Sequence, residues 1–283
     1  MTAAVLGIGL GLVTGMAACG GPAVKDALTP EHCTTRSDAG EITLSAEQSE
    51  VATTIVAVAI RRGLPRRAVT IALATAEQES KMRNLDHGDR DSVGVFQQRP
   101  SQGWGTVDQL QDPAYATNRF YAALVKVDGW RKLPLHEAAQ RVQRSAYGPA
   151  YADHEPKAKV ITTALTGRGG SGGFTCVLRP KGTDTTVRDV RAAVHSDWGL
   201  RRVRPETDGF SVRMGAAAPR RHSLAMSFWV VARANTFGID SVRHAGKQWR
   251  SRDDDEVWHE TEGNDPPGRI TAELRPEPTG SPE

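Results

Sequence analysis

The chain has 283 residues, of which 39% are hydrophobic and 24% are charged. This composition is typical of a globular protein with enough apolar residues for at least one core, and it excludes a fully disordered chain and a polytopic membrane protein. The 36 basic residues barely exceed the 33 acidic ones and interleave with them along the chain, so no nucleic acid partner is expected. Three cysteines are too few for a disulfide-rich scaffold.

The N-terminal segment, residues 1–24, carries no charge and contains an apolar run over residues 6–13. Such a segment is typical of a signal peptide or a membrane anchor, so it predicts an exported protein attached to the membrane of the cell envelope. The five residues that end at Gly20 read Met-Ala-Ala-Cys-Gly and resemble a bacterial lipobox, in which Cys19 would be lipidated. An uncleaved anchor with an incidental cysteine is the alternative.

A linker over residues 25–41 is expected to precede a helical domain over residues 42–166. Apolar residues recur there at helical spacing, and Ser45 with Gln48 forms the pattern of an N-terminal capping box. The predicted helices cover residues 44–62, 65–80, 113–127, 135–146 and 155–165, with a polar loop over residues 81–106.

A glycine-rich linker over residues 167–173 is predicted to join a second domain over residues 174–275, followed by a tail over residues 276–283. Strand-like runs at 174–178, 210–214, 241–244, 248–250 and 269–274 alternate with helical runs at 186–195 and 223–236. The expected fold class is therefore a mainly α helical domain followed by a second, small α+β domain.

The most informative single residue is Glu79, near the end of the predicted helix over residues 65–80. It is expected on the apolar face of that helix, whereas Glu77 is expected to face solvent. Partial burial and the negative end of the helix dipole both disfavour a carboxylate, so the pKa of Glu79 should be raised. A carboxyl group that stays protonated can donate a proton to the leaving oxygen of a glycosidic bond. A capping or ion-paired glutamate is the alternative.

The sequence around this glutamate carries a recognisable set of motifs. Glu79-Ser80 at a helix end is followed by Ser92-Val-Gly-Val-Phe-Gln97, and later by Ala146-Tyr147. Together these motifs resemble the lysozyme-like superfamily, and within it the soluble lytic transglycosylases. The chain departs from that pattern at Gly148-Pro149-Ala150, where the family has Asn-Ala-Gly. The resemblance covers residues 42–166 and implies a lysozyme-like helical domain.

The resemblance also implies roles for individual residues. Glu79 would be the catalytic acid and base, Ser92 and Gln97 would shape the floor of the cleft, and Tyr147 would lie beside Glu79. Trp104, in a loop bounded by glycines, is a candidate for stacking on a sugar ring. A partly buried anchor of the loop is the other interpretation of Trp104.

The activity implied by the resemblance is cleavage of peptidoglycan. Such a muramidase would cut the β-1,4 bond between N-acetylmuramic acid and N-acetylglucosamine, without a cofactor. A lytic transglycosylase leaves 1,6-anhydro ends and needs one catalytic glutamate. The expected partners are peptidoglycan glycan strands and the membrane that the N-terminal anchor reaches. The alternative is a non-catalytic cell-wall-binding or scaffolding protein that keeps the cleft, which the altered Tyr147-Gly148-Pro149 would favour.

No metal site is predicted. Aligned from Asp89 with a calcium-binding loop, the chain has Val93 and Pro100 where that loop needs oxygen ligands. The acidic run over residues 253–256 is interpreted as a solvated loop. The histidines of the second domain, His222, His244 and His259, lack the spacing of a zinc site. The second domain is therefore expected to be non-catalytic.

Two cysteines remain if Cys19 is lipidated. Cys33 and Cys176 are expected to form a disulfide bond, because an exported chain folds in an oxidising compartment.

Overall fold

Strands as well as helices build the first half of the chain, so the expected fold class, a mainly α helical domain with a small α+β domain, is wrong. The protein is α+β, with a three-stranded and a six-stranded sheet among its described residues. The structure is a computed structural model that describes residues 30–144, 148–215, 218–253, 255–262 and 265–275. All described helices and strands belong to the second of two units, residues 31–283. The predicted signal segment and Cys19 lie outside the described residues.

The smaller sheet joins segments from distant parts of the sequence. It consists of β1 (His32–Ser37), β2 (Gly40–Leu44) and β3 (Phe174–Val177), in the antiparallel order β2-β1-β3. Cys33 lies directly opposite Cys176 in the register, and a disulfide bond joins them with a Cα–Cα distance of 3.9 Å. This is the cysteine pair predicted from the sequence. A strand predicted for the second domain therefore pairs with residues predicted to be a linker.

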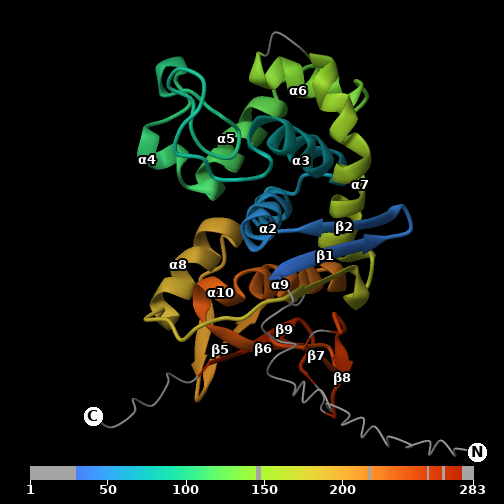
Figure 1. The fold of residues 1–283 in the computed structure, drawn as a ribbon, viewed down its shortest axis with the longest axis vertical. Helices are drawn as coiled ribbons and strands as arrows, with labels where there is room; N and C mark the ends of the chain where they lie inside the picture. The colour runs from blue at the N-terminus through green and yellow to red at the C-terminus, as the bar shows by residue number, and fades with distance from the viewer. Residues whose placement is uncertain (1–29, 145–147, 216–217, 254, 263–264, 276–283) are drawn as a thin grey trace, which may run out of the picture. The chain divides into compact units, whose positions relative to one another are not determined.

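The segment over residues 46–163 is mainly helical, and most of its helices lie above this sheet in the view of Figure 1. The capping box predicted at Ser45 is present: its hydroxyl accepts the Gln48 N–H, and the Gln48 side chain accepts the Ser45 N–H. The helices of this part are α2 (Ala46–Arg61), α3 (Arg66–Ser80), α4 (Val107–Leu110), α5 (Pro113–Leu124), α6 (Leu135–Gln143) and α7 (Glu155–Thr163). A short 3-10 helix, η2 (Gly148–His154), connects α6 to α7.

The larger sheet is antiparallel and has the order β4-β5-β9-β6-β7-β8. Its strands are β4 (Val203–Glu206), β5 (Gly209–Arg213), β6 (Ile239–His244), β7 (Lys247–Arg250), β8 (His259–Glu260) and β9 (Arg269–Leu274). The helices of this part are α8 (Val187–Trp198), α9 (Arg220–Ala232) and α10 (Ala234–Phe237). Helix α9 packs against β6 and β9 on one side and against α2 on the other (Figure 1).

A buried polar network joins α2, α8 and α9. The carboxylate of Asp197 forms an ion pair of 3.0 Å with Arg233 and accepts hydrogen bonds from Thr54 and from the indole of Trp229. Asp197 and Arg233 are 6% and 7% exposed. Because this network and the surrounding apolar residues form one continuous core, the helical part and the six-stranded sheet are packed together.

The glycine-rich segment after α7 packs closely against its neighbours. Gly167 has a φ of +73°, and a Cβ atom there would lie 2.3 Å from the carbonyl oxygen of Arg221. Only glycine fits this position without moving the backbone of α9. Gly169 similarly lies close to the carbonyl oxygen of Arg36 at the end of β1.

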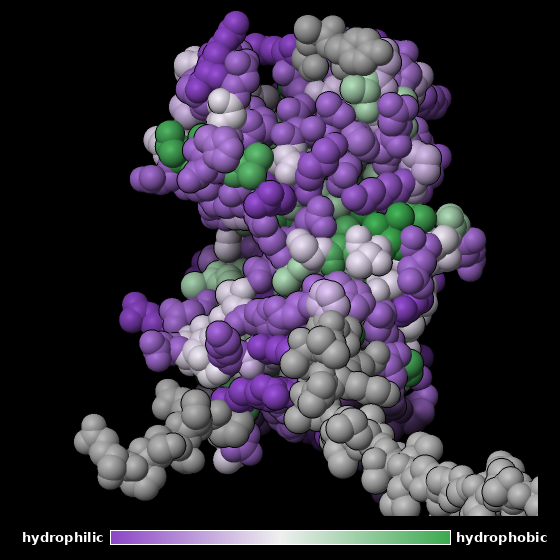
Figure 2. All heavy atoms as spheres, viewed as in Figure 1, coloured by the Kyte–Doolittle hydropathy of each residue, from purple (hydrophilic) through white to green (hydrophobic). Residues whose placement is uncertain are grey.

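The surface in the view of Figure 1 is mainly hydrophilic. Figure 2 shows that hydrophobic side chains gather beside the β1–β2 hairpin and that a few others lie near α4 and α5. Among the described residues, no helix combines the length and the apolar character needed to cross a membrane.

Candidate active site

Glu79 occupies the last turn of α3, one residue before the helix ends. The helix ends in an αL motif, in which the N–H of Lys81 donates to the Glu77 carbonyl, and the N–H of Met82 donates in addition to the Ala76 carbonyl. Lys81 and Met82 both have positive φ angles, 57° and 55°, which cost free energy for residues other than glycine. The buried side chain of Met82 holds this turn against the core and thereby fixes the direction of the helix end.

Two neutral side chains hydrogen-bond to the half-buried carboxyl group of Glu79. The hydroxyl of Tyr151, in η2, donates to Glu79 Oε1 over 2.6 Å. The second is the side-chain amide of Gln143, from the end of α6. Tyr151 is only 1% exposed, so its hydroxyl is fixed in place by the packing around its ring.

Burial decides the protonation of Glu79. Withdrawal from solvent raises the pKa of this carboxyl group above its ordinary value, and the bonds from Tyr151 and Gln143, which favour the ionised form, do not cancel the effect. The direction agrees with the expectation from the sequence. A carboxyl group of this kind can donate a proton and later take one back.

The opposite expectation for Glu77 is wrong. This residue is 8% exposed, and its carboxylate forms an ion pair of 2.9 Å with Lys157. The helical spacing predicted a solvent-facing side, but α7 packs against that side of α3. Glu77 is therefore a paired structural carboxylate.

The loop that carries Ser92 and Gln97 is attached to the end of α3. The hydroxyl of Ser80 donates to the Val95 carbonyl over 2.8 Å, and the Gln143 side chain donates to the Phe96 carbonyl over 2.7 Å. Gln143 thus contacts both Glu79 and this loop. The Glu79-Ser80 motif and the Ser92–Gln97 motif are therefore held next to each other.

Glycine is required inside that loop. Val93 and Gln98 form a short antiparallel bridge, and Gly94, within the turn, has a φ of +77°. A Cβ atom on Gly94 would lie 2.3 Å from the Leu110 carbonyl oxygen. The tight turn of the Ser-x-Gly-x-Phe-Gln motif therefore depends on this glycine.

The other residues chosen from the sequence differ in burial and in their hydrogen-bond partners. Ser92 is buried, and the side chain of Gln97 donates to the carbonyls of His87 and Gly94 within its own loop. Their role in shaping a cleft remains a prediction. Trp104 is half-buried, and its carbonyl accepts a hydrogen bond of 2.9 Å from Arg119. Tyr147 lies outside the described residues.

Sequence reasoning missed Gln143 and Tyr151. A second Ala-Tyr pair, Ala150-Tyr151, follows the first by four residues, and this repetition is the signal that could have identified Tyr151. No comparable signal exists for Gln143, because its contact with Glu79 joins two helices that are distant in sequence.

The acidic residues of the polar loop have structural partners. Asp91 accepts from the Ser101 N–H over 2.8 Å and from the Arg99 guanidinium over 2.6 Å. These bonds hold the pKa of Asp91 far below its ordinary value, so it stays ionised. Asp86 is exposed and pairs with the neighbouring His87. Neither residue has the environment of a second proton donor.

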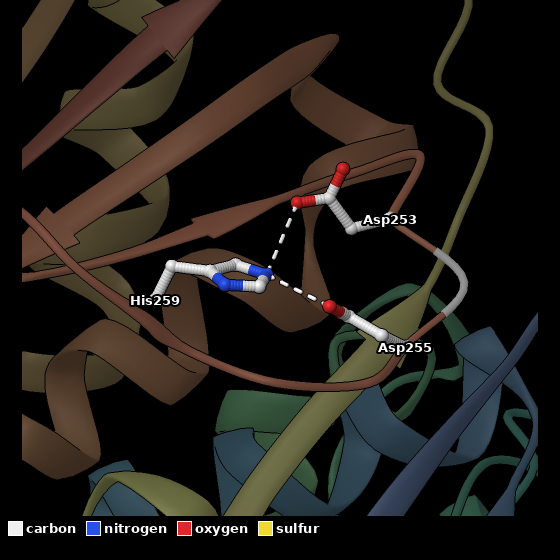
Figure 3. A group of neighbouring side chains, drawn as sticks. All are labelled: Asp253, Asp255 and His259. Carbon is white, nitrogen blue, oxygen red and sulfur yellow. Dashed lines mark ion pairs between the residues drawn. The ribbon is translucent and has the colours of Figure 1, made fainter.

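A second group of titratable side chains lies in the acidic run near β8 (Figure 3). The imidazole of His259 points between two carboxylates, with Nε2 3.0 Å from Asp255 and 3.6 Å from Asp253. Their ligand atoms lie within 4.8 Å of one another, a geometry that could receive a divalent cation. Burial, and secondly the neighbouring Asp255, raises the pKa of Asp253. The ion pairs to His259 are sufficient to explain this arrangement.

A contact between His244 and Ser223 lies inside the second half of the protein. His244 is 7% exposed, and its ring lies 3.3 Å from the Ser223 hydroxyl and 3.1 Å from the Arg269 carbonyl. The Ser223 hydroxyl donates to the Arg220 carbonyl over 2.8 Å, so its proton is already used within α9. This geometry is that of a satisfied core pair.

Comparison with known proteins adds no family assignment. No protein-family model matches the chain, and none of the curated proteins is significantly similar to it. The geometry around Glu79 is therefore the main basis for assigning a function to the protein.

Proposed function

We propose that this protein cleaves peptidoglycan at the β-1,4 bond between N-acetylmuramic acid and N-acetylglucosamine, with Glu79 as its single acid and base. The observation that carries the proposal is the half-buried Glu79 carboxyl, whose pKa is raised by burial and which Tyr151 holds by a 2.6 Å hydrogen bond. The resemblance of its Glu-Ser and Ser-x-Gly-x-Phe-Gln motifs to those of lytic transglycosylases supports the same chemistry.

The proposed reaction has two proton transfers. Glu79 donates its proton to the glycosidic oxygen as the bond from that oxygen to C1 of the muramic acid breaks. The N-acetyl group of the same sugar stabilises the positive charge that develops at C1. The C6 hydroxyl then attacks C1, and the ionised Glu79 accepts the hydroxyl proton, which regenerates the acid. Tyr151 stabilises the carboxylate between the two steps, because its hydroxyl donates to Oε1.

The test is the product of digestion by the wild-type protein. The released muropeptides should carry 1,6-anhydro ends, which are one water lighter than hydrolysed ends, as read by mass spectrometry. Asp86→Asn, Asp89→Asn and Asp91→Asn should each keep substantial activity, since one carboxyl group suffices. Reducing ends, together with loss of activity in one aspartate variant, would instead indicate a hydrolase with two carboxylates. Absence of cleavage on several peptidoglycans would favour the cell-wall-binding scaffold.

We also propose that the protein is exported and attached to the membrane through residues 1–24. The Cys33–Cys176 disulfide supports export, because such bonds persist in oxidising compartments. Fractionation of cells tests the lipid anchor: the wild type should sediment with membranes, and Cys19→Ser should not. Equal distribution of the two proteins would contradict lipidation at Cys19.

A further inference from the structure

A pocket with a positively charged lining lies beside Trp104. It has a volume of about 360 Å³ and is formed by the loop over residues 102–104, the end of α5 with the turn after it, and the end of α6. Four of its lining residues are basic, namely Arg119, Lys126, Arg141 and Arg144. No acidic residue is among the described residues that line it.

The four cations differ in how firmly they are held. Arg119 is fixed, because its guanidinium donates to the carbonyls of Gly103 and Trp104, each over 2.9 Å. Arg141 makes an exposed ion pair of 3.4 Å with Glu137, one turn earlier in α6, and such surface pairs contribute little free energy. Lys126 and Arg144 are exposed. Like charges gathered around one hollow give it a positive potential that attracts anions.

The rest of the lining is aromatic and apolar. Trp104 lines the pocket together with Ala122, Ala123, Val127 and Val142. An apolar surface next to basic side chains suits a ligand that combines a sugar ring with acidic groups. The ring can pack on the apolar part of the pocket while the acidic groups reach the basic side chains. A simple inorganic anion would contact only the basic side chains and leave the apolar part of the lining unused.

The pocket and the candidate active site share the last turn of α6. Val142 and Arg144 line the pocket, and Gln143 between them hydrogen-bonds to Glu79 and to the Phe96 carbonyl. The last turn of α6 therefore contributes to both places, and α6 packs against α5, which supplies the other wall (Figure 1).

We propose that this pocket is a subsite for the carboxylate-bearing peptide stems of peptidoglycan, so that the protein prefers peptide-substituted glycan strands to naked ones. The inference rests on the proposed function for its substrate. It adds the specificity: the sugar lies against Trp104, and carboxylates of the stem pair with two of the three exposed cations, Lys126 and Arg141.

Binding in the absence of turnover tests the subsite. Glu79→Gln protein is mixed with two preparations of the same glycan strands, one with its peptide stems and one from which an amidase has removed them, and the dissociation constants are compared. We expect roughly tenfold tighter binding to the peptide-bearing strands, with a preference that falls as salt is added. Lys126→Glu with Arg141→Glu, in the same background, should abolish the preference. Arg201→Glu with Arg202→Glu, two exposed reversals in the loop after α8, is the charge-matched control and should keep it.

The outcomes separate the two proposals. Equal binding of both strands by Glu79→Gln protein, or an unchanged preference in the charge-reversal variant, overturns the subsite even if the wild type cleaves peptidoglycan. A preference lost only on charge reversal supports the subsite even if the wild type releases no product, in which case the catalytic proposal alone fails. Thermal melting of each variant checks that the fold is intact.

Discussion

Glu79 and Asp197 are both carboxylates withdrawn from solvent, and their partners differ. Asp197 lies 3.0 Å from the Arg233 guanidinium and accepts two further bonds, from Thr54 and Trp229, so its charge is fully matched inside the core. The side chains that hydrogen-bond to Glu79, Tyr151 and Gln143, are both neutral. A buried carboxylate that is paired with a cation holds elements of the fold together, whereas burial raises the pKa of Glu79, which suits that carboxyl group to proton transfer.

The largest expected effect is on activity. Glu79→Gln keeps the shape of the side chain but removes the exchangeable proton, so turnover on peptidoglycan should fall by about 10²–10⁴-fold. Glu77→Gln, two residues earlier in the same helix, is the matched control, because its carboxylate pairs with Lys157 and takes no part in the chemistry. Release of soluble muropeptides measures both variants. Similar losses of turnover in the two variants would contradict the proposal that Glu79, and not the ion-paired Glu77, exchanges the proton.

The next effect is on stability. Arg233→Met leaves the buried Asp197 without its cation, which should lower the free energy of unfolding by about 3–5 kcal/mol. Denaturation in urea measures the loss. The double variant, Arg233→Met with Asp197→Asn, should lose less than the sum of the two single losses, since no unpaired charge remains in the core. Strictly additive losses would show that the ion pair does not act as a unit.

The smallest effect is a shift in pH dependence. The proposed reaction requires protonated Glu79, so activity should fall as the pH rises through its raised pKa. Tyr151→Phe removes a bond that favours the ionised carboxyl, so the pKa of Glu79 should rise further. The alkaline limb of the pH–rate profile should move up by at most about one pH unit, equivalent to about 1.4 kcal/mol. Tyr115→Phe, in α5, is the control and should leave that limb in place. A downward shift in Tyr151→Phe would contradict the assignment.

Local signals in the sequence predicted several elements well. The capping box at Ser45 placed the start of α2, and β9 spans the six residues that its apolar alternation indicated. The end of α3, and with it the position of Glu79, followed from the helical spacing. These features depend on neighbours in sequence, which is why they could be predicted.

Apart from the Cys33–Cys176 disulfide, features that depend on distant residues were not predicted. The strands β1 and β2 are short, and β1 gains its second neighbour from β3, far along the chain. Glu77 was misplaced because α3 is covered on several sides, so helical spacing alone could not identify an outer face. The pairing of Asp197 with Arg233 and the contact of Gln143 with Glu79 likewise depend on the arrangement of whole helices.

The disulfide between Cys33 and Cys176 encloses a large part of the chain. The two cysteines are 143 residues apart, and the enclosed stretch contains α3, η2 and the loop beside Glu79. A protease that cuts the backbone once within residues 34–175 therefore produces two fragments that stay covalently attached. Such a nicked molecule migrates as one species until a reductant is added, and the turn that carries Glu79 stays covalently attached to the segment that carries Tyr151.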